Sequence, residues 1–278
     1  MITPSTLHFA RNLLRLQELR QPRDVEVLTL TSGVRVRLHR PPNTGRPAPA
    51  LIWLHGGGYV LGTARQDDDL CRRFSRALGI TVAAVDYRLA PEHPYPLALE
   101  DCHQALEWLV RLPAVDPARV AIGGGSAGGG LAAALSLMAR DHGDITPVCQ
   151  VLSYPMLDDR TGSTVDVDQR GQRLWSRSSN RFGWNSYLRD ADPRVAVPAR
   201  RDDLSGLPPT WVGVGTLDLF HDEDVRYAER LRRAGVSCEL RVVPGAFHAF
   251  DLVAPHASVT HSFFASQCAH LRRAFEQG

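Results

Sequence analysis

One short stretch constrains the fold more than any other: a serine set among glycines, between an apolar run and a helix-forming run. Ser126 lies at the centre of Gly123–Gly130, after residues 119–122, which we interpret as a buried strand. Residues 131–139 are strong helix formers. The Gly-x-Ser-x-Gly pattern of Gly124–Gly128 is typical of a nucleophilic serine held in a strained strand-to-helix turn. The sequence therefore predicts that the Ser126 hydroxyl stands clear of a sheet, at the positive end of the following helix.

The same glycines admit a second interpretation. Gly123, Gly125 and Gly128 spell G-x-G-x-x-G, a pattern of dinucleotide-binding turns. Such a turn should open the first strand–helix–strand unit, with an acidic residue ending the next strand about 20 residues later. Here several predicted strands come earlier, and Asp141 and Asp144 precede the next strand. The sequence therefore favours the nucleophilic serine, and we expect no nucleotide or other cofactor.

Composition narrows the class of protein. The chain has 278 residues, of which 44% are apolar and 22% charged, as in ordinary globular domains. Its net charge of +2 gives no field that favours nucleic acid or an anionic membrane. The five cysteines form no C-x-x-C pair, so neither a disulfide framework nor a zinc site is indicated. We see no signal peptide and no spanning apolar stretch, so we expect a cytoplasmic monomer or homodimer.

Alternating strand and helix patterns predict one α/β domain over residues 1–278, with a mostly parallel sheet and helices on both faces. A hairpin is expected first, over residues 25–30 and 34–39, separated by a Ser-Gly turn. Further strands are predicted at residues 50–54, 80–85, 119–122, 147–153, 210–214 and 238–243, and helices at 67–78, 97–112, 131–139, 225–234 and 257–275.

Two segments stand outside that alternation. Residues 4–20 form an amphipathic pattern with Thr3 as a possible N-cap. Residues 156–206 are rich in arginine, aspartate and serine, with interspersed aromatic residues. We predict that residues 1–22 and 156–206 form a small cap over the carboxyl edge of the sheet. The alternative is a surface excursion in which the aromatic residues, Trp175, Phe182, Trp184 and Tyr187, are only anchors.

A serine nucleophile needs a base and a group that orients the base. Asp218 and His248 each follow one of the last two predicted strands, where an acid and a histidine are expected. Asp222 is the competing acid, but it starts a helix, where a carboxylate commonly caps free N–H groups. We therefore prefer Asp218. The competing bases are His221, His256, His261 and His270.

An oxyanion-binding element is predicted from His55-Gly56-Gly57-Gly58, directly after the strand at residues 50–54. Three consecutive glycines leave backbone N–H groups unshielded, and such groups can face a developing negative oxygen. The position upstream of the serine turn fits this role.

Together these motifs resemble the hormone-sensitive-lipase-like family of α/β-hydrolases, the bacterial family IV esterases. The matching residues run in the family's order: His55–Gly58, Asp86–Glu92, Gly124–Gly129, Asp218 with Asp222, and His248 before Ala249-Phe250. The resemblance implies an α/β-hydrolase fold with an eight-stranded, mostly parallel sheet. It implies a triad of Ser126, Asp218 and His248, an oxyanion hole from the N–H groups of Gly57, Gly58 and Ala127, and no metal.

The implied activity is hydrolysis of small to medium acyl esters through an acyl-serine intermediate. Amides, lactones or acetylated metabolites are alternative substrates, and a non-catalytic small-molecule-binding protein on the same fold is an alternative function. Two positions depart from the family pattern. Gly125 stands where aspartate or threonine usually precedes the nucleophile, and Ala249 stands where glycine is common after the histidine.

Overall fold

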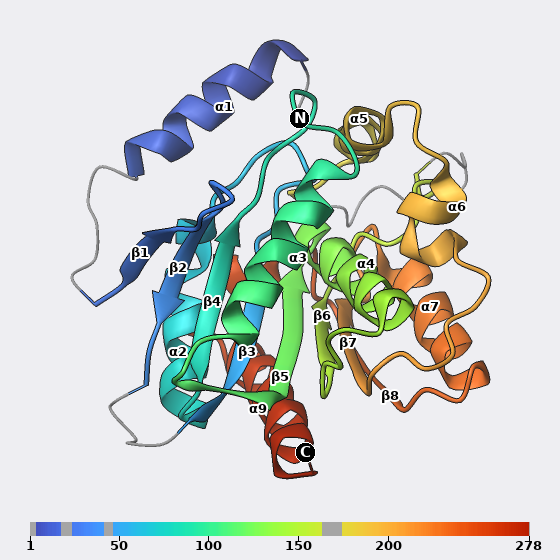
Figure 1. Ribbon diagram of the computed structural model, residues 1–278. Helices are drawn as coiled ribbons and strands as arrows, with labels where there is room; N and C mark the ends of the chain where they lie inside the picture. The colour runs from blue at the N-terminus through green and yellow to red at the C-terminus, as the bar shows by residue number, and fades with distance from the viewer. Residues whose placement is uncertain (1–3, 18–23, 42–46, 163–173, 278) are drawn as a thin grey trace.

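Eight strands form one sheet in the part of the chain that the structure, a computed structural model, describes: residues 4–17, 24–41, 47–162 and 174–277 (Figure 1). The strand order is β1-β2-β4-β3-β5-β6-β7-β8. Strand β2 is antiparallel to both β1 and β4, and the other neighbours are parallel. The strands are β1 (Glu26–Thr29), β2 (Arg35–His39), β3 (Ala48–Leu54), β4 (Thr81–Asp86), β5 (Val115–Gly125), β6 (Gln150–Ser153), β7 (Thr210–Gly215) and β8 (Cys238–Val243).

Helices cover both faces of this sheet. Helices α3 and α4 lie side by side on the face nearest the viewer in Figure 1, while α2 and α9 lie behind the sheet. The helices are α1 (Pro4–Gln17), α2 (Asp68–Leu78), α3 (Leu97–Val110), α4 (Ala127–His142), α5 (Arg177–Leu188), α6 (Pro193–Ala196), α7 (His221–Arg233), α8 (Phe250–Val253) and α9 (Ser258–Gln277).

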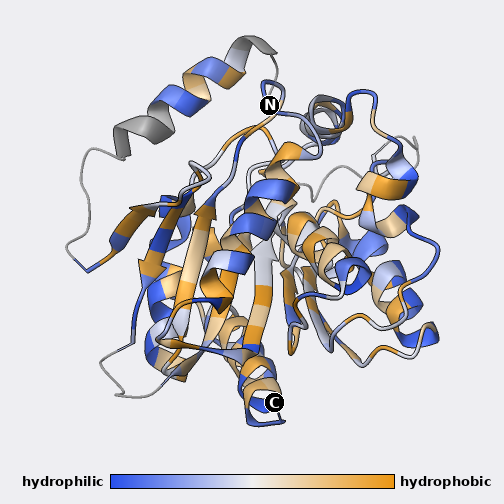
Figure 2. Ribbon diagram, in the orientation of Figure 1, coloured by the Kyte–Doolittle hydropathy of each residue, from blue (hydrophilic) through white to orange (hydrophobic). Residues whose placement is uncertain are grey.

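The core is divided in two by the sheet, because successive strand residues point to opposite faces. On β3, Ile52 and Leu54 are buried beneath α3 and α4, whereas Leu51 and Trp53 are buried on the side of α2 and α9. Figure 2 shows hydrophobic residues gathered on the central strands and on α4. Burial on both faces explains why the central strands read as continuous apolar runs in the sequence.

The position of β3 determines where a site can form. Strand β4 lies on one side of β3 and β5 on the other, so the order of the strands along the chain reverses there. Ligands of open α/β sheets bind in the crevice outside the carboxyl ends of strands at such a reversal. The His55–Gly58 loop follows β3, and Ser126 follows β5, so both lie at this crevice.

The predicted α/β-hydrolase architecture is confirmed, with differences at the ends of elements. The hairpin pairs as predicted, with Glu26 opposite Leu38. Strand β5 begins at Val115, earlier than predicted, because its first residues run beside Ala48 of β3. Helix α7 begins at His221, so Asp222 lies in its first turn. Four of the five cysteines are buried, as expected of small hydrophobic side chains.

The N-terminal helix α1 extends along the carboxyl edge of the sheet in Figure 1. Leu7 is buried, and Arg11 donates from Nε to the Val60 carbonyl at 2.7 Å while pairing with Glu92. The predicted N-cap Thr3 lies outside the described residues. None of the helices described is both long and apolar enough to cross a membrane.

Candidate active site

The backbone at Ser126 is strained, as the glycine pattern predicts. Its φ is 56° and its ψ is −122°, a combination that non-glycine residues rarely adopt. Neighbouring backbone groups hold this conformation: the Ser126 N–H donates to the Ser153 carbonyl at 2.9 Å, and the Ser126 carbonyl accepts from the N–H groups of Gly130 and Met156. The turn between β5 and α4 therefore fixes the direction of the serine side chain.

Gly128 has a packing reason of its own. A Cβ atom at this position would lie 2.0 Å from the Leu54 carbonyl oxygen and 2.4 Å from the His55 carbonyl oxygen. Only a hydrogen in place of a side chain allows the first turn of α4 to lie this close to the end of β3. The glycine thus brings the serine turn against the predicted oxyanion loop.

Asp218, His248 and Ser126 form a continuous hydrogen-bonded chain. The Nε2 atom of His248 lies 2.9 Å from the Ser126 Oγ, and its Nδ1 lies 2.9 Å and 3.1 Å from the two carboxylate oxygens of Asp218. All three residues are buried. The structure therefore brings together the three side chains that the sequence selects, from segments far apart along the chain.

The competing residues lie elsewhere. Asp222 points outward with 70% of its side chain exposed, and its carboxylate contacts His221 Nδ1 at 2.8 Å. His256 and His261 are exposed, and His270 lies near Glu239 and Pro209, at the amino ends of β8 and β7. The structure does not bring any of them to the Ser126 hydroxyl.

The imidazole of His248 is held by rings on two sides. Tyr154 and Phe220 meet it edge-on, with ring centroids at 5.0 Å and 5.1 Å. Asp218 is fixed in turn, because its Oδ1 accepts the Phe220 N–H at 3.0 Å. These contacts limit rotation of both side chains, so the histidine keeps one nitrogen toward the carboxylate and the other toward the serine.

The glycine loop after β3 has the conformation expected of an anion-binding turn. Gly57 and Gly58 have φ values of 130° and 61°, and the Gly57 carbonyl accepts the N–H groups of Val60 and Leu61. Among the described residues, the N–H groups of Gly57, Gly58 and Ala127 donate to no backbone carbonyl in the hydrogen bonds of the loops and helix caps. These three donors remain available to a negative oxygen beside Ser126.

Tyr87 contacts His55, the first residue of this loop. Its hydroxyl donates to the His55 carbonyl at 2.6 Å, and its ring stacks on the His55 ring at 4.2 Å. Burial lowers the pKa of His55, which favours a neutral imidazole in this stack. From the sequence, Tyr87 was recognisable only as part of the family motif Asp86–Glu92. Its contacts show that it holds the glycine loop in position.

A pocket of about 160 Å³ opens beside Ser126. Its apolar wall includes Leu61, Leu70 and Trp175, and Asp67 contributes a carboxylate. Burial raises the pKa of Asp67 to about 7, although a hydrogen bond from Trp53 Nε1 at 2.9 Å opposes the shift. Sequence reasoning missed Asp67, because it stands at a predicted helix start, where an aspartate is ordinary.

The insertion contacts the site through its aromatic residues. Trp175 lies against Gly58, where a Cβ would come 2.1 Å from the indole ring, and it also lines the pocket. Trp184 and Tyr187 of α5 pack on Tyr59, whose ring stacks on Tyr187 at 4.1 Å. Trp184 and Tyr187 thus anchor the insertion, and Trp175 forms part of the pocket wall. Residues 163–173 of the insertion lie outside the described part of the chain.

This sheet topology, with a serine turn after β5 and an acid and a histidine after β7 and β8, defines the class of α/β-hydrolases. A family model described as alpha/beta hydrolase fold matches residues 51–252. The chain belongs to this family, which confirms the resemblance noted from the motifs.

Several characterised relatives are similar along most of their length. The carboxylic ester hydrolase LipN of Mycobacterium tuberculosis is 38% identical over 253 residues, covering 84% of this chain and 67% of that protein. The ethyl acetate hydrolase of Pseudomonas putida is 34% identical over 226 residues, covering 77% and 70%.

Solved structures agree with this relationship. A bacterial heroin esterase superposes with a TM-score of 0.86 at 37% identity, covering 98% of this chain and 92% of that one. The esterase LipW of Mycobacterium marinum gives a TM-score of 0.87 at 35% identity, covering 99% and 92%.

Proposed function

We propose that this protein is a serine carboxylesterase that hydrolyses short-chain acyl esters, with Ser126 as nucleophile, His248 as base and Asp218 as the orienting acid. The observation that carries the proposal is the hydrogen-bonded chain from Asp218 through His248 to the Ser126 Oγ, at 2.9 Å for each closest contact. Esterase activity among the relatives supports it.

In the first half of the reaction, the Ser126 Oγ attacks the ester carbonyl carbon while His248 Nε2 takes the hydroxyl proton. Asp218 accepts the hydrogen bond from Nδ1 and stabilises the imidazolium that forms. The negative oxygen of the tetrahedral intermediate is bound by the N–H groups of Gly57, Gly58 and Ala127. Each donor of this kind contributes a factor of about 10²–10³ in kcat.

In the second half, the imidazolium donates its proton to the leaving alcohol, and an acyl-serine remains. His248 then takes a proton from a water molecule, which attacks the acyl carbonyl. The tetrahedral intermediate collapses, the acid leaves, and the imidazolium returns the proton to the Ser126 Oγ. The chemistry uses this chain's own side chains throughout and leaves the enzyme in its starting protonation state.

The size of the pocket supports short acyl groups. The pocket volume of about 160 Å³ lies below the roughly 300–1,000 Å³ of typical small-molecule pockets, which favours small substrates. We also propose that residues 1–22 and 156–206 act as a small cap. The described part of the insertion contributes Leu174 and Trp175 to the pocket wall, and Arg11 ties α1 to the segment after the glycine loop.

Substitution of the serine tests the proposal. We expect Ser126→Ala to lose p-nitrophenyl acetate hydrolysis by on the order of 10⁴-fold or more while unfolding at the wild-type temperature. Ser136→Ala is the matched control, because Ser136 lies on α4, which begins directly after Ser126, and among the described residues its hydroxyl bonds to the Ala132 carbonyl alone. Hydrolysis by Ser126→Ala at the wild-type rate would contradict the proposal.

A substrate series separates the alternatives. Initial rates on p-nitrophenyl esters from acetate to decanoate, with a lactone and an anilide included, should be highest for the short esters. A chain that only binds small molecules would turn over none of them. A higher kcat/KM for the lactone or the anilide would make this protein a lactonase or an amidase with the same residues.

A further inference from the structure

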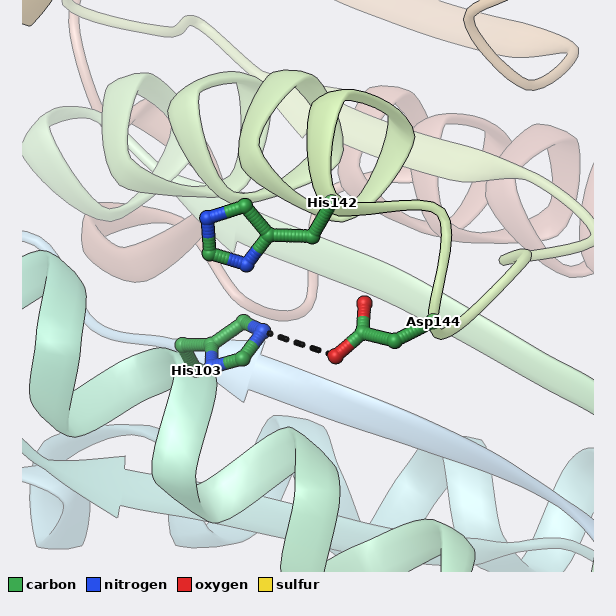
Figure 3. Close-up of side chains that lie close together, drawn as sticks. All are labelled: His103, His142 and Asp144. Atoms are coloured by element: carbon green, nitrogen blue, oxygen red, sulfur yellow. Dashed lines mark ion pairs between the residues drawn. The ribbon is translucent and has the colours of Figure 1, made fainter.

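Away from the candidate active site, two histidines and an aspartate converge between α3 and the end of α4 (Figure 3). His103 comes from α3, His142 is the last residue of α4, and Asp144 lies in the loop that follows. One ligand atom from each residue lies within 4.8 Å of the others. Figure 3 shows the carboxylate of Asp144 directed at His103, with the ring of His142 beside both.

The spacing between His103 and Asp144 fits shared coordination better than a hydrogen bond. His103 Nε2 lies 3.5 Å from the Asp144 Oδ2, and this buried nitrogen has no hydrogen-bond partner among the described residues. Two ligands bound to one tetrahedral Zn²⁺ at about 2.0–2.2 Å are separated by roughly 3.4 Å. The pair therefore already has the separation of two corners of a coordination tetrahedron.

The third ligand can reach the same point. His142 and Asp144 are exposed, so their side chains can rotate by the small amount that closes 4.8 Å to a coordination distance. The turn that joins them is fixed, because Gly143 caps α4 with φ 73° and donates its N–H to the Ala139 carbonyl. The carboxyl end of a helix also carries partial negative charge, which favours a cation.

The arginine closest to His142 along the chain is engaged in other contacts. Arg140 precedes His142 by two residues, but its guanidinium pairs with Asp141 and donates to the Asp203 and Ser205 carbonyls. Its guanidinium is therefore committed to groups outside the cluster. Two imidazole groups and one carboxylate are a set of donors that divalent metals of the zinc type select.

We propose that His103, His142 and Asp144 form a binding site for Zn²⁺ or a similar d-block dication, which clips α3 to the end of α4 and stabilises the fold. Three protein ligands leave one position for water. The site is not catalytic, because the sixteen residues of α4 place it about 24 Å from Ser126. The motif escapes sequence inspection because its two histidines are far apart along the chain.

Calorimetric titration of metal-free protein with ZnCl₂ tests the proposal. We expect one Zn²⁺ per chain with a dissociation constant in the micromolar range or below. At free Zn²⁺ 100-fold above that constant, the unfolding temperature should rise by about 5 °C, since a ligand that binds only the folded state stabilises it. Neither readout depends on hydrolysis, so failure here is separate from failure of the proposed esterase activity.

Variants assign the ligands. His142→Gln and Asp144→Asn change exposed side chains, so both should fold. Each should weaken Zn²⁺ binding at least tenfold and so reduce the temperature rise by about half or more at the same Zn²⁺ concentration. His261→Gln, an exposed histidine on α9, is the matched control and should bind as wild type does. Millimolar or weaker binding by the wild type, or unchanged binding by His142→Gln and Asp144→Asn, would overturn the proposal.

Discussion

Replacing Gly128 by alanine sets two physical effects against each other. Gly128 lies in the first turn of α4, and alanine stabilises a helix by about 1 kcal/mol relative to glycine. The packing around Gly128 predicts that alanine destabilises the fold. The new Cβ would lie 2.0 Å from the Leu54 carbonyl oxygen, whereas ordinary contacts begin at 3.4 Å, so the two backbones must separate by about 1.4 Å.

The loss of unfolding free energy depends on which part of the structure must move to admit the new Cβ. Leu54 ends the central strand β3 and is buried, so it cannot yield as a surface side chain does. Overpacking of a core typically costs about 1–3 kcal/mol, and a backbone clash lies at or above the upper limit. The same shift separates Ser126 from the Gly57–Gly58 loop. A displacement of about 1 Å is associated with a loss of roughly 10²-fold in rate.

Two further glycines calibrate the effect. At Gly129 the new Cβ would lie 2.8 Å from the Pro155 Cβ, and at Gly125 it would lie 3.6 Å from the Tyr154 ring. We therefore expect the loss of unfolding free energy and of kcat/KM on p-nitrophenyl acetate to rank Gly128→Ala above Gly129→Ala. Gly125→Ala should have both values near wild type.

Denaturant unfolding and initial rates provide both quantities. If Gly128→Ala were as stable and as active as wild type, or more so, helix propensity would outweigh the close approach, and the packing argument would be wrong. A large loss in Gly125→Ala would contradict the ordinary contact distance of 3.6 Å between the new Cβ and the Tyr154 ring.

Three other predictions rest on four substitutions of acidic residues. Asp218→Asn should reduce kcat by roughly 10⁴-fold, and Asp222→Asn should leave it almost unchanged; steady-state rates with the reverse order would make Asp222 the orienting acid. Burial raises the pKa of Glu223 from 4.5 to about 8, so the folded state holds the proton more tightly and wild-type stability falls as pH rises between these values. Glu223→Gln should remove that fall, which is at most about 1.4 kcal/mol per pH unit when measured by denaturant unfolding. If the unfolding free energies of the two proteins changed in parallel with pH, the raised pKa of Glu223 would be refuted. Asp67, with its pKa near 7, becomes negative in the pocket above neutral pH and should oppose the oxyanion. The ratio of kcat/KM for Asp67→Asn to wild type should therefore rise by a factor of roughly two to ten from pH 6 to pH 8, and a flat ratio would show that this charge does not reach the reaction.

The sequence was sufficient to predict the architecture and to select three side chains that the structure brings within hydrogen-bond distance. Strand and helix alternation predicts the sheet, because the central strands are buried on both faces and carry continuous apolar runs. The serine turn is recognisable because its glycines are required by close backbone approach, as Gly128 shows. Asp218 and His248 are recognisable because each follows a strand whose end lies at the same edge.

Long-range packing explains what the sequence could not provide. The early start of β5 at Val115 depends on pairing with β3, and local preference disfavours a strand that includes Pro117. The buried state of Asp67 depends on its contact with Trp53. Trp175 could be assigned to the insertion but not to the pocket, because its contact with Gly58 joins segments distant in sequence.

The most direct test of the central claim is mass spectrometry of protein treated with a fluorophosphonate, which reacts with an activated serine. The account predicts a single adduct on the peptide that contains Ser126, absent in Ser126→Ala and formed much more slowly in His248→Ala. An adduct on a different residue, or no adduct in a wild-type protein that hydrolyses p-nitrophenyl acetate, would contradict it.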